Sequence, residues 1–269
     1  MDTITFLHSG EMGDIVASLA VVREICEREN KKAVVYLDTT GGMKVNDREL
    51  NRVMSFQLHN RGTRFNHASY EFIMPLILCQ PYVYTVCEYD GTGSLPPIDY
   101  NLNAFRKCVL NGETLKATNG NLLFLHQYAM GLDMGYKGPW LTVSNEEDDR
   151  RYNTIVARTS RCQSAHVFYT AYEKVLKDAH FIGTDFEYDL FENAFGFKPN
   201  RLKVTNAANA AIAMANSNRF ISNSTLFYWI AVGLGHPNII HELAVDIPAT
   251  YFPNGNPQIL YVQGGHAVK

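Results

Sequence analysis

Two glycines and two carboxylates lie in one short segment near the start of the chain. The segment begins at His8 and reads HSGEMGDIVAS, with Glu11 and Asp14 between and after Gly10 and Gly13. It follows the apolar run TITFL and leads into a stretch with helical periodicity. A glycine turn between a strand and a helix exposes unpaired backbone amides, which favour an anion. The two carboxylates would repel a phosphate at this turn, so a plain phosphate loop does not account for them.

Polar side chains follow three of the strands that we predict in the second half of the chain. The loop ARTSRCQ offers hydroxyl groups, amides and a guanidinium, which suit a phosphate group. The loop GTDFEYD carries acids that can bind ribose hydroxyls or charge a helix start. The segment SNSTLFYW has polar residues at a helix start, where they also serve as ordinary N-caps. Open α/β sheets bind ligands at the carboxyl ends of strands, so we interpret the loops as one site: Thr159, Ser160, Arg161, Asp185, Glu187, Asn223, Ser224 and Thr225.

These residues need a scaffold of alternating strands and helices. In the first half we predict strands at TITFL, KKAVVYLDTT and YVYTVCEY, with helices at DIVASLAVVREICERE, at FIMPLILCQ before Pro81, and within ATNGNLLFLHQYAMGLDMG. The first helix places Ile15, Leu19, Val22 and Cys26 on one face. We interpret TGSLPPIDYN as a loop because of its proline and glycine content.

The alternation stops and restarts around KGPWLTVSNEEDDRRYNT, which is typical of a domain boundary. Beyond it we predict strands in TIVARTSR, HFIGTD, RLKVT, RFISN and NIIHEL, with a helix after each of the first four. Repeated strand–helix units predict parallel sheets covered by helices. We therefore expect an α/β protein of two Rossmann-type domains, residues 1–145 and 146–269, whose sheets face a cleft.

Composition excludes several classes of function. The 269 residues carry a formal net charge of −3, which provides no bulk attraction to nucleic acid. No apolar stretch approaches the roughly 20 residues that span a bilayer, and the first residues do not resemble a signal peptide. Five cysteines without CxxC spacing indicate free thiols, so we expect a cytoplasmic protein. The sequence contains no Walker loop and no Gly-X-Ser-X-Gly, which disfavours those nucleotide-binding and hydrolase classes.

The order of these segments resembles glycosyltransferase family 9, which includes ADP-heptose:lipopolysaccharide heptosyltransferases of GT-B fold. The resemblance rests on GEMGDIVASLAVVREI, IVARTSRCQ, FIGTDFEYDLF and NAAIAMANSNRFISNSTLFYWIAVGLGHPNII. Gly13 and Asp14 match the Gly-Asp pair that opens the first helix of the family. The similarity covers residues 4–30 and about 139–245 and is faint between them.

The resemblance implies roles for the matched residues. Asp14 would be the general base that deprotonates an acceptor hydroxyl as it attacks the anomeric carbon of a nucleotide-diphosphate sugar. The second domain would provide most of the residues that bind this donor, and Gly13 of the first domain would also contact it. The residues of the second domain are Thr159, Ser160, Arg161, Gly183, Glu187, Asn223, Ser224, Thr225 and His241. The amides, hydroxyls and guanidinium would stabilise the leaving diphosphate, so that no metal or cofactor is required and the anomeric centre inverts. Consistently, the sequence contains no Asp-X-Asp triplet.

The sequence departs from the family at several points. Asn223 replaces the acid of the usual Asp-Thr-Gly motif, and Gln163 and His166 lie where a lysine is often found. His241 could contact the nucleotide, and a purely structural role is the alternative for this residue. Five polar residues of the first half are candidates to contact the acceptor, with simple solvation as the alternative: Arg64, His67, Asp99, Asn103 and Arg106.

Two other functions fit the same scaffold. One is a non-catalytic protein that binds a nucleotide or sugar nucleotide, which the replacement at Asn223 favours. The other is an assembly protein whose own side chains fill the expected cleft. The sequence leaves open the base and sugar of the donor, the acceptor and the oligomeric state.

Overall fold

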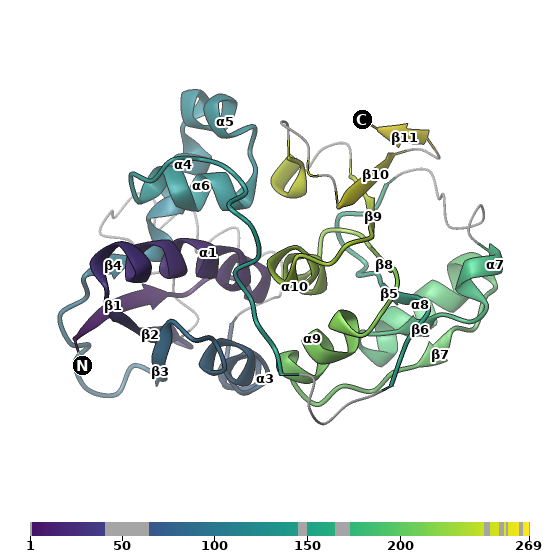
Figure 1. Cartoon of the computed structure of the whole chain (residues 1–269), viewed down its shortest axis with the longest axis horizontal. Helices are drawn as coiled ribbons and strands as arrows, with labels where there is room; N and C mark the ends of the chain where they lie inside the picture. Colours follow the sequence, from purple (N-terminus) through teal and green to yellow (C-terminus); the bar gives the residue numbers. More distant parts are fainter. Residues whose placement is uncertain are drawn as a thin grey trace. The chain divides into compact units, whose positions relative to one another are not determined.

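The computed structural model consists of two compact units, residues 1–142 and 143–269 (Figure 1). The structure describes residues 2–40, 65–144, 150–164, 173–244, 248–252, 256, 258–263 and 266–268. In each unit the strands are mostly parallel and alternate with helices, as the sequence predicts.

The first unit is built on a four-stranded parallel sheet in the order β3-β2-β1-β4. Its strands are β1 (Thr3–His8), β2 (Lys32–Asp38), β3 (Val83–Tyr89) and β4 (Tyr100–Asn101). Its helices are α1 (Met12–Glu29), α3 (His67–Leu78), α4 (Phe105–Leu110), α5 (Gly112–Thr118) and α6 (Leu122–Ala129), with a 3-10 turn at η1 (Leu102–Ala104). The strand β4 lies in the segment expected to be a loop; its two residues are too few to give a periodic pattern.

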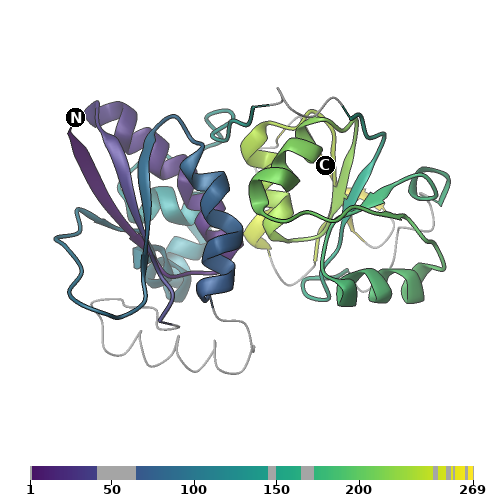
Figure 2. The same cartoon turned by 90° about the horizontal axis from the view of Figure 1, so that it is seen from below.

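The first helix takes its position from its apolar stripe. All four predicted core residues of α1 are buried, and full burial of such side chains contributes about 1.5–3 kcal/mol each. Figure 2 shows α1 and α3 along one face of the sheet. The residues of β2 on that face are buried, whereas the alternate positions Val34 and Tyr36 are half-buried.

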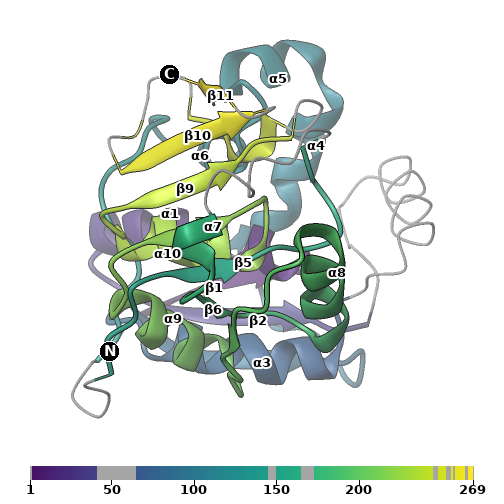
Figure 3. The ribbon, with the colours of Figure 1, turned by 90° about the vertical axis from the view of Figure 1, so that its right-hand side faces the viewer.

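The second unit has a seven-stranded sheet in the order β11-β10-β9-β8-β5-β6-β7, parallel except for the β10–β11 pair (Figure 3). Its strands are β5 (Ile155–Ala157), β6 (His180–Phe181), β7 (Asn200–Arg201), β8 (Phe220–Ser222), β9 (Ile239–Glu242), β10 (Ile259–Gln263) and β11 (His266–Val268). Its helices are α7 (Glu173–Leu176), α8 (Asp185–Phe195), α9 (Ala207–Ala215) and α10 (Leu226–Leu234), with a 3-10 turn at η3 (Pro248–Thr250). The sequence analysis did not predict β10 and β11.

The central strands of the second sheet are buried on both faces. Every residue of β5, β8 and β9 is buried. On one face Val156 and Ile221 pack with Phe191 and Phe195 of α8. The helices α9 and α10 contact each other, and α10 also contacts β8. Such burial explains why these strands read as apolar runs in the sequence.

Candidate active site

In the first unit, the loops after β1 and β4 begin at neighbouring points of the sheet. The chain leaves β1 toward β2 on one side, whereas β4 pairs with β1 on the other side. This reversal of strand order lies at the carboxyl ends of the strands, which is the place where open α/β sheets bind ligands. It brings the loop at residues 8–14 next to η1 and α4.

An ion pair between Asp14 and Arg106 joins the start of α1 to α4. The Asp14 Oδ2 accepts a hydrogen bond from the Arg106 Nη2, and the side chains are 15% and 16% exposed. The guanidinium carbon lies 4.3 Å from the ring centre of Phe105. Asp14 itself is in the first turn of α1, where the helix dipole favours a negative charge. The structure therefore gives the predicted base a cationic partner that is fixed by an aromatic ring.

Two neutral histidines lie beneath this ion pair. The His8 Nδ1 accepts a 2.8 Å hydrogen bond from the Gly10 N–H, and the His126 ring centre lies 4.1 Å from that of Phe105. Burial, helped by the positive charge of Arg106, lowers the pKa of His8 to about 3. Burial also lowers the pKa of His126 well below its usual value. Both rings therefore stay uncharged around the guanidinium at neutral pH.

Two contacts fix the backbone of the first loop. The Asn103 Oδ1 accepts hydrogen bonds from the Ser9 N–H at 2.9 Å and the Ser9 hydroxyl at 3.0 Å. A Cβ atom on Gly10 would lie 2.5 Å from the His8 Cε1 and 3.0 Å from the Asp14 Oδ2. Gly10 is therefore required by the close approach of the His8 and Asp14 side chains.

The remaining residues expected on the acceptor side have different surroundings. Asp99 accepts hydrogen bonds from the Thr5 N–H and hydroxyl in the middle of β1, and these lower its pKa. His67 is exposed at the start of α3, and its hydrogen bond to Glu88 raises its pKa. Of the four that the structure describes, only Asn103 and Arg106 contact the segment of residues 9–14. Arg64 lies outside the described residues.

The second unit has its own reversal of strand order, between β5 and β8. The loop after β5 carries Thr159, Ser160 and Arg161, of which the last two are exposed. Asn223 follows β8, is fully buried and forms hydrogen bonds with the backbone of this loop. The topology therefore brings together two of the three loops predicted to form one site.

A buried ion pair, which the sequence analysis did not predict, holds the ends of this loop. The Arg158 Nε and Nη2 donate to the Glu242 carboxylate at 2.7 and 3.0 Å. The same carboxylate accepts a 2.6 Å hydrogen bond from the Ser164 N–H. Both charged side chains are at most 5% exposed. The clue in the sequence is one charged residue at the end of each of two buried strands, because a buried charge requires a partner.

The other predicted donor residues mostly have local structural partners. Thr184 and Glu187 form a capping box at the start of α8, and Gly183 leaves room for it and for Phe181. Thr225 caps α10, and the Ser224 hydroxyl lies 3.0 Å from that of Thr250. Gly13 lies within α1, in the first unit.

His241 is enclosed in the core of the second unit. Its ring nitrogens lie 3.1 Å from the Ser222 carbonyl oxygen and 2.8 Å from the Thr250 hydroxyl. Burial lowers its pKa to about 3. This environment is that of a structural histidine, the alternative considered above.

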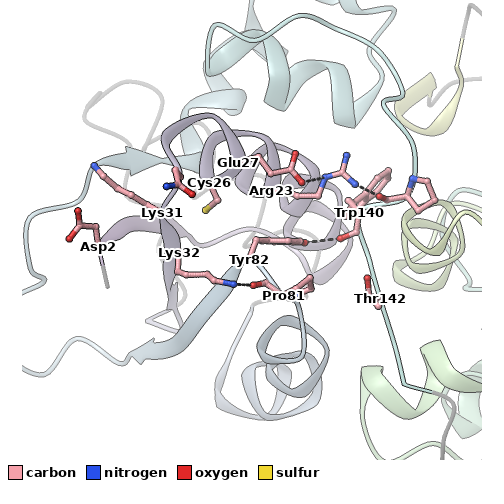
Figure 4. Close-up of a pocket in the computed structure, with 12 residues that line it drawn as sticks. Asp2, Arg23, Cys26, Glu27, Lys31, Lys32, Pro81, Tyr82, Trp140 and Thr142 are labelled. Carbon is pink, nitrogen blue, oxygen red and sulfur yellow. Dashed lines mark hydrogen bonds and ion pairs between the residues drawn. The ribbon is translucent and has the colours of Figure 1, made fainter.

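A pocket of about 650 Å³ lies at the end of the first sheet away from Asp14, by the amino ends of β1 and β2 (Figure 4). Its walls include Arg23 of α1, Lys32, Tyr82 and Trp140. Arg23 and Lys32 donate to the carbonyl oxygens of Pro139 and Pro81, and the Tyr82 hydroxyl donates to that of Trp140 at 2.9 Å. The contacts of Arg23 and Tyr82 hold residues 139–140 against the rest of the first unit. They and the Lys32 contact direct Arg23 and Lys32 at backbone carbonyl groups, while Lys31 pairs with Glu29.

No cluster of three or more His, Cys, Asp or Glu side chains in the described ranges has a geometry that could hold a metal ion. No helix among the same residues is long and apolar enough to cross a membrane.

Two Rossmann-type units with parallel sheets and polar loops at the strand ends define the GT-B class of fold. Solved glycosyltransferases have this arrangement. The chain is similar to the E. coli heptosyltransferase WaaC, solved with ADP-2-deoxy-2-fluoro heptose (TM-score 0.55, 9% identity, 98% and 94% of the two chains covered). It is also similar to a family 9 glycosyltransferase from Veillonella parvula (TM-score 0.58, 9% identity, 97% of this chain and 85% of that chain covered). A third similar structure is the E. coli ADP-heptose lipopolysaccharide heptosyltransferase II (TM-score 0.57, 13% identity, 97% of this chain and 90% of that chain covered).

Comparison of the sequence alone shows no such similarity. No family model matches it, and no curated protein matches it. The similarity is therefore one of fold, extending over nearly the whole chain.

Proposed function

We propose that this protein is a glycosyltransferase that moves a sugar from a nucleotide-diphosphate donor to an acceptor hydroxyl. The observation that carries the proposal is the position of the Asp14 carboxylate, at the strand-order reversal of a unit whose fold matches sugar-nucleotide enzymes. Heptosyltransferases of similar fold were solved with ADP-2-deoxy-2-fluoro heptose and with ADP-D-beta-D-heptose. An ADP-linked sugar is accordingly the first donor to test.

Asp14 acts as the general base in this proposal. Its carboxylate accepts the proton of the acceptor hydroxyl while that oxygen attacks the anomeric carbon. Such assistance contributes about 10²–10⁴-fold to a rate. Arg106 holds the carboxylate in one orientation, and attack from the side opposite the diphosphate inverts the anomeric centre.

The second unit holds the donor. The loop of residues 159–161 and the start of α10 offer backbone amides, hydroxyls and one guanidinium to the diphosphate. These groups stabilise the negative charge that develops on the leaving group. We propose that they do so without a metal ion.

The test compares wild type with Asp14→Asn, using release of nucleoside diphosphate from a panel of ADP-, UDP- and GDP-linked sugars, with and without EDTA. Asp14→Asn should lower the rate at least about 100-fold, and EDTA should leave the wild-type rate unchanged. Glu113→Gln is the matched control, because Glu113 is also an acid in the first turn of a helix. Proton NMR of a transferred sugar reads the anomeric configuration, and retention would contradict the inverting mechanism.

Two observations favour the non-catalytic alternative. Asp14 already accepts a hydrogen bond from a guanidinium, and Asn223 replaces an acid of the family. A binding protein would be stabilised by a nucleoside diphosphate, by about 2.7 kcal/mol at 100 times the dissociation constant, yet would turn over no donor. Binding of a nucleoside diphosphate by wild type without turnover of any donor would support that alternative. Equal, measurable rates for wild type and Asp14→Asn would instead exclude Asp14 as the base.

A further inference from the structure

The side chain of Asn223 forms hydrogen bonds with several backbone groups of the loop that follows β5, and we call this set of hydrogen bonds the bracket. Its Nδ2 donates to the carbonyl oxygens of Thr159 at 3.0 Å and Arg161 at 2.7 Å, with a longer contact of 3.4 Å to that of Cys162. Its Oδ1 accepts a hydrogen bond from the Thr159 N–H at 3.1 Å. Asn223 is fully buried, so these contacts use both ends of the amide.

The two ends of this amide are not interchangeable. Rotation by 180° would place the Oδ1 against the carbonyl oxygens and the Nδ2 against an N–H group. The site therefore needs one donor group and one acceptor group on the same short side chain, which only asparagine supplies at this length. An aspartate here would direct a buried negative oxygen at carbonyl oxygens that now accept hydrogen bonds.

The loop has an unusual backbone that needs such a bracket. Cys162 adopts φ +54°, in the left-handed region that side chains other than glycine and asparagine seldom occupy. Conformations of this kind persist where surrounding contacts over-determine them. Here Asn223 holds residues 159–162 from inside, while Glu242 holds Arg158 and Ser164 at the two ends.

We propose that Asn223 is a positioning residue that shapes the loop of residues 159–162, and that it does not act as a ligand of the donor sugar. Its amide turns three loop carbonyl groups inward, toward the bracket. The exposed Ser160 and Arg161 side chains are thereby left on the outer side of the loop. The replacement of an acid by Asn223 is, on this account, a requirement of this loop. The link to a donor rests on the proposed function; the link to the loop does not.

The test is the isosteric change Asn223→Asp, since the two readings predict opposite results. As a bracket, Asn223→Asp should lower the apparent Tm by about 5 °C or more and speed amide hydrogen exchange across residues 159–162 by about tenfold or more. As a sugar ligand, the restored acid should leave both unchanged and strengthen donor binding. Unchanged exchange, or tighter binding of an ADP-linked sugar, would overturn the proposal.

The matched control is Asn206→Asp. Asn206 caps α9 through its Oδ1, which accepts a 2.9 Å hydrogen bond from the Asn209 N–H. A carboxylate serves equally well at this position, so this variant should keep the wild-type Tm and exchange rates. Equal losses in both variants would mean that added charge alone is responsible, and would also overturn the proposal.

Two further measurements keep the test decisive. If Asn223→Asp does not fold, Asn223→Ala removes the amide without adding a charge; faster exchange of the loop supports the bracket, and wild-type exchange overturns it. The defect of Asn223→Asp should also shrink at acid pH, because a protonated carboxyl regains an O–H donor. A defect that does not change with pH contradicts this.

Failure of the proposed function gives a different result from failure of the bracket. Tm and hydrogen exchange are measured on the free protein. If wild type binds none of ADP, UDP and GDP in calorimetry, the proposed donor site is wrong, whereas the exchange result still decides the role of Asn223. If wild type binds one of them, Asn223→Asp should weaken that binding, and unchanged affinity would overturn the positioning role.

Discussion

Arg158 and Glu242 form a buried ion pair that reaches across β8, from the end of β5 to the end of β9. Two hydrogen bonds join the side chains, and the Ser164 N–H adds a third bond to the carboxylate. The pair therefore closes the base of the same loop that Asn223 shapes from inside. A loop fixed in this way loses little conformational entropy when it binds a ligand.

Removal of one charge from this pair should destabilise the second unit strongly. Glu242→Gln leaves the buried Arg158 uncompensated, which costs about 3–5 kcal/mol in comparable cases. Glu173→Gln is the control, because it removes an exposed i,i+4 pair with Lys177 that contributes about 0–1 kcal/mol. Urea unfolding measures both, and a loss below about 1 kcal/mol for Glu242→Gln would contradict the stabilising role.

The first loop should tolerate no side chain at Gly10. Gly10→Ala places a Cβ against His8 and the Asp14 carboxylate, so we expect a loss of about 1–3 kcal/mol in unfolding free energy. Gly112→Ala is the matched change, since a Cβ there meets nothing within 4 Å and lies at the start of α5. It should be neutral or slightly stabilising. If both variants unfold alike, the close approach does not matter.

Arg106 should control the protonation of the histidines beneath it. Its positive charge is one of the causes that lower the pKa of His8 and of His126. Arg106→Gln should therefore raise the pKa of His8 above about 3, although burial, the larger cause, keeps it below 6.5. NMR titration of the imidazole measures the shift directly. A pKa of His8 that does not rise would show that the guanidinium charge does not reach the ring.

Mild acid should destabilise both units before their carboxylates titrate. Burial lowers the pKa of His8 in the first unit and of His241 in the second, each from 6.5 to about 3. Between these values the unfolded chain binds the proton more readily, so stability falls as pH drops from 6.5 toward 3. Each histidine contributes about 1.4 kcal/mol per pH unit in that window.

The measurement is urea unfolding at pH 7.0, 6.0 and 5.0, a range that lies above the usual pKa of carboxyl groups. Exposed His67 has a raised pKa and acts in the opposite direction, so His67→Gln serves as the background for the series. A stability that does not change from pH 7.0 to 5.0 would mean that His8 and His241 are not buried as neutral rings.

The sequence by itself determined the alternation of strands and helices and the parallel sheets. Apolar periodicity is a local property, and the core residues of α1 and the buried strands β5, β8 and β9 follow from it. It also placed polar residues at strand ends, where this class of fold binds ligands. Short strands such as β4 left no periodic signal, because two residues complete no period.

Only the tertiary structure decided which polar residues meet. Asp14 and Arg106 are 92 residues apart, and Thr159 and Asn223 are 64 apart. Each pair meets because strand order reverses at β1/β4 and at β5/β8, and that order is a non-local property of the chain. The same topology directs Asp99 to Thr5 and encloses His241 in the core. Residue type indicated that these side chains could do chemistry, whereas burial and hydrogen-bond partners decided which of them shape a loop and which can face a ligand.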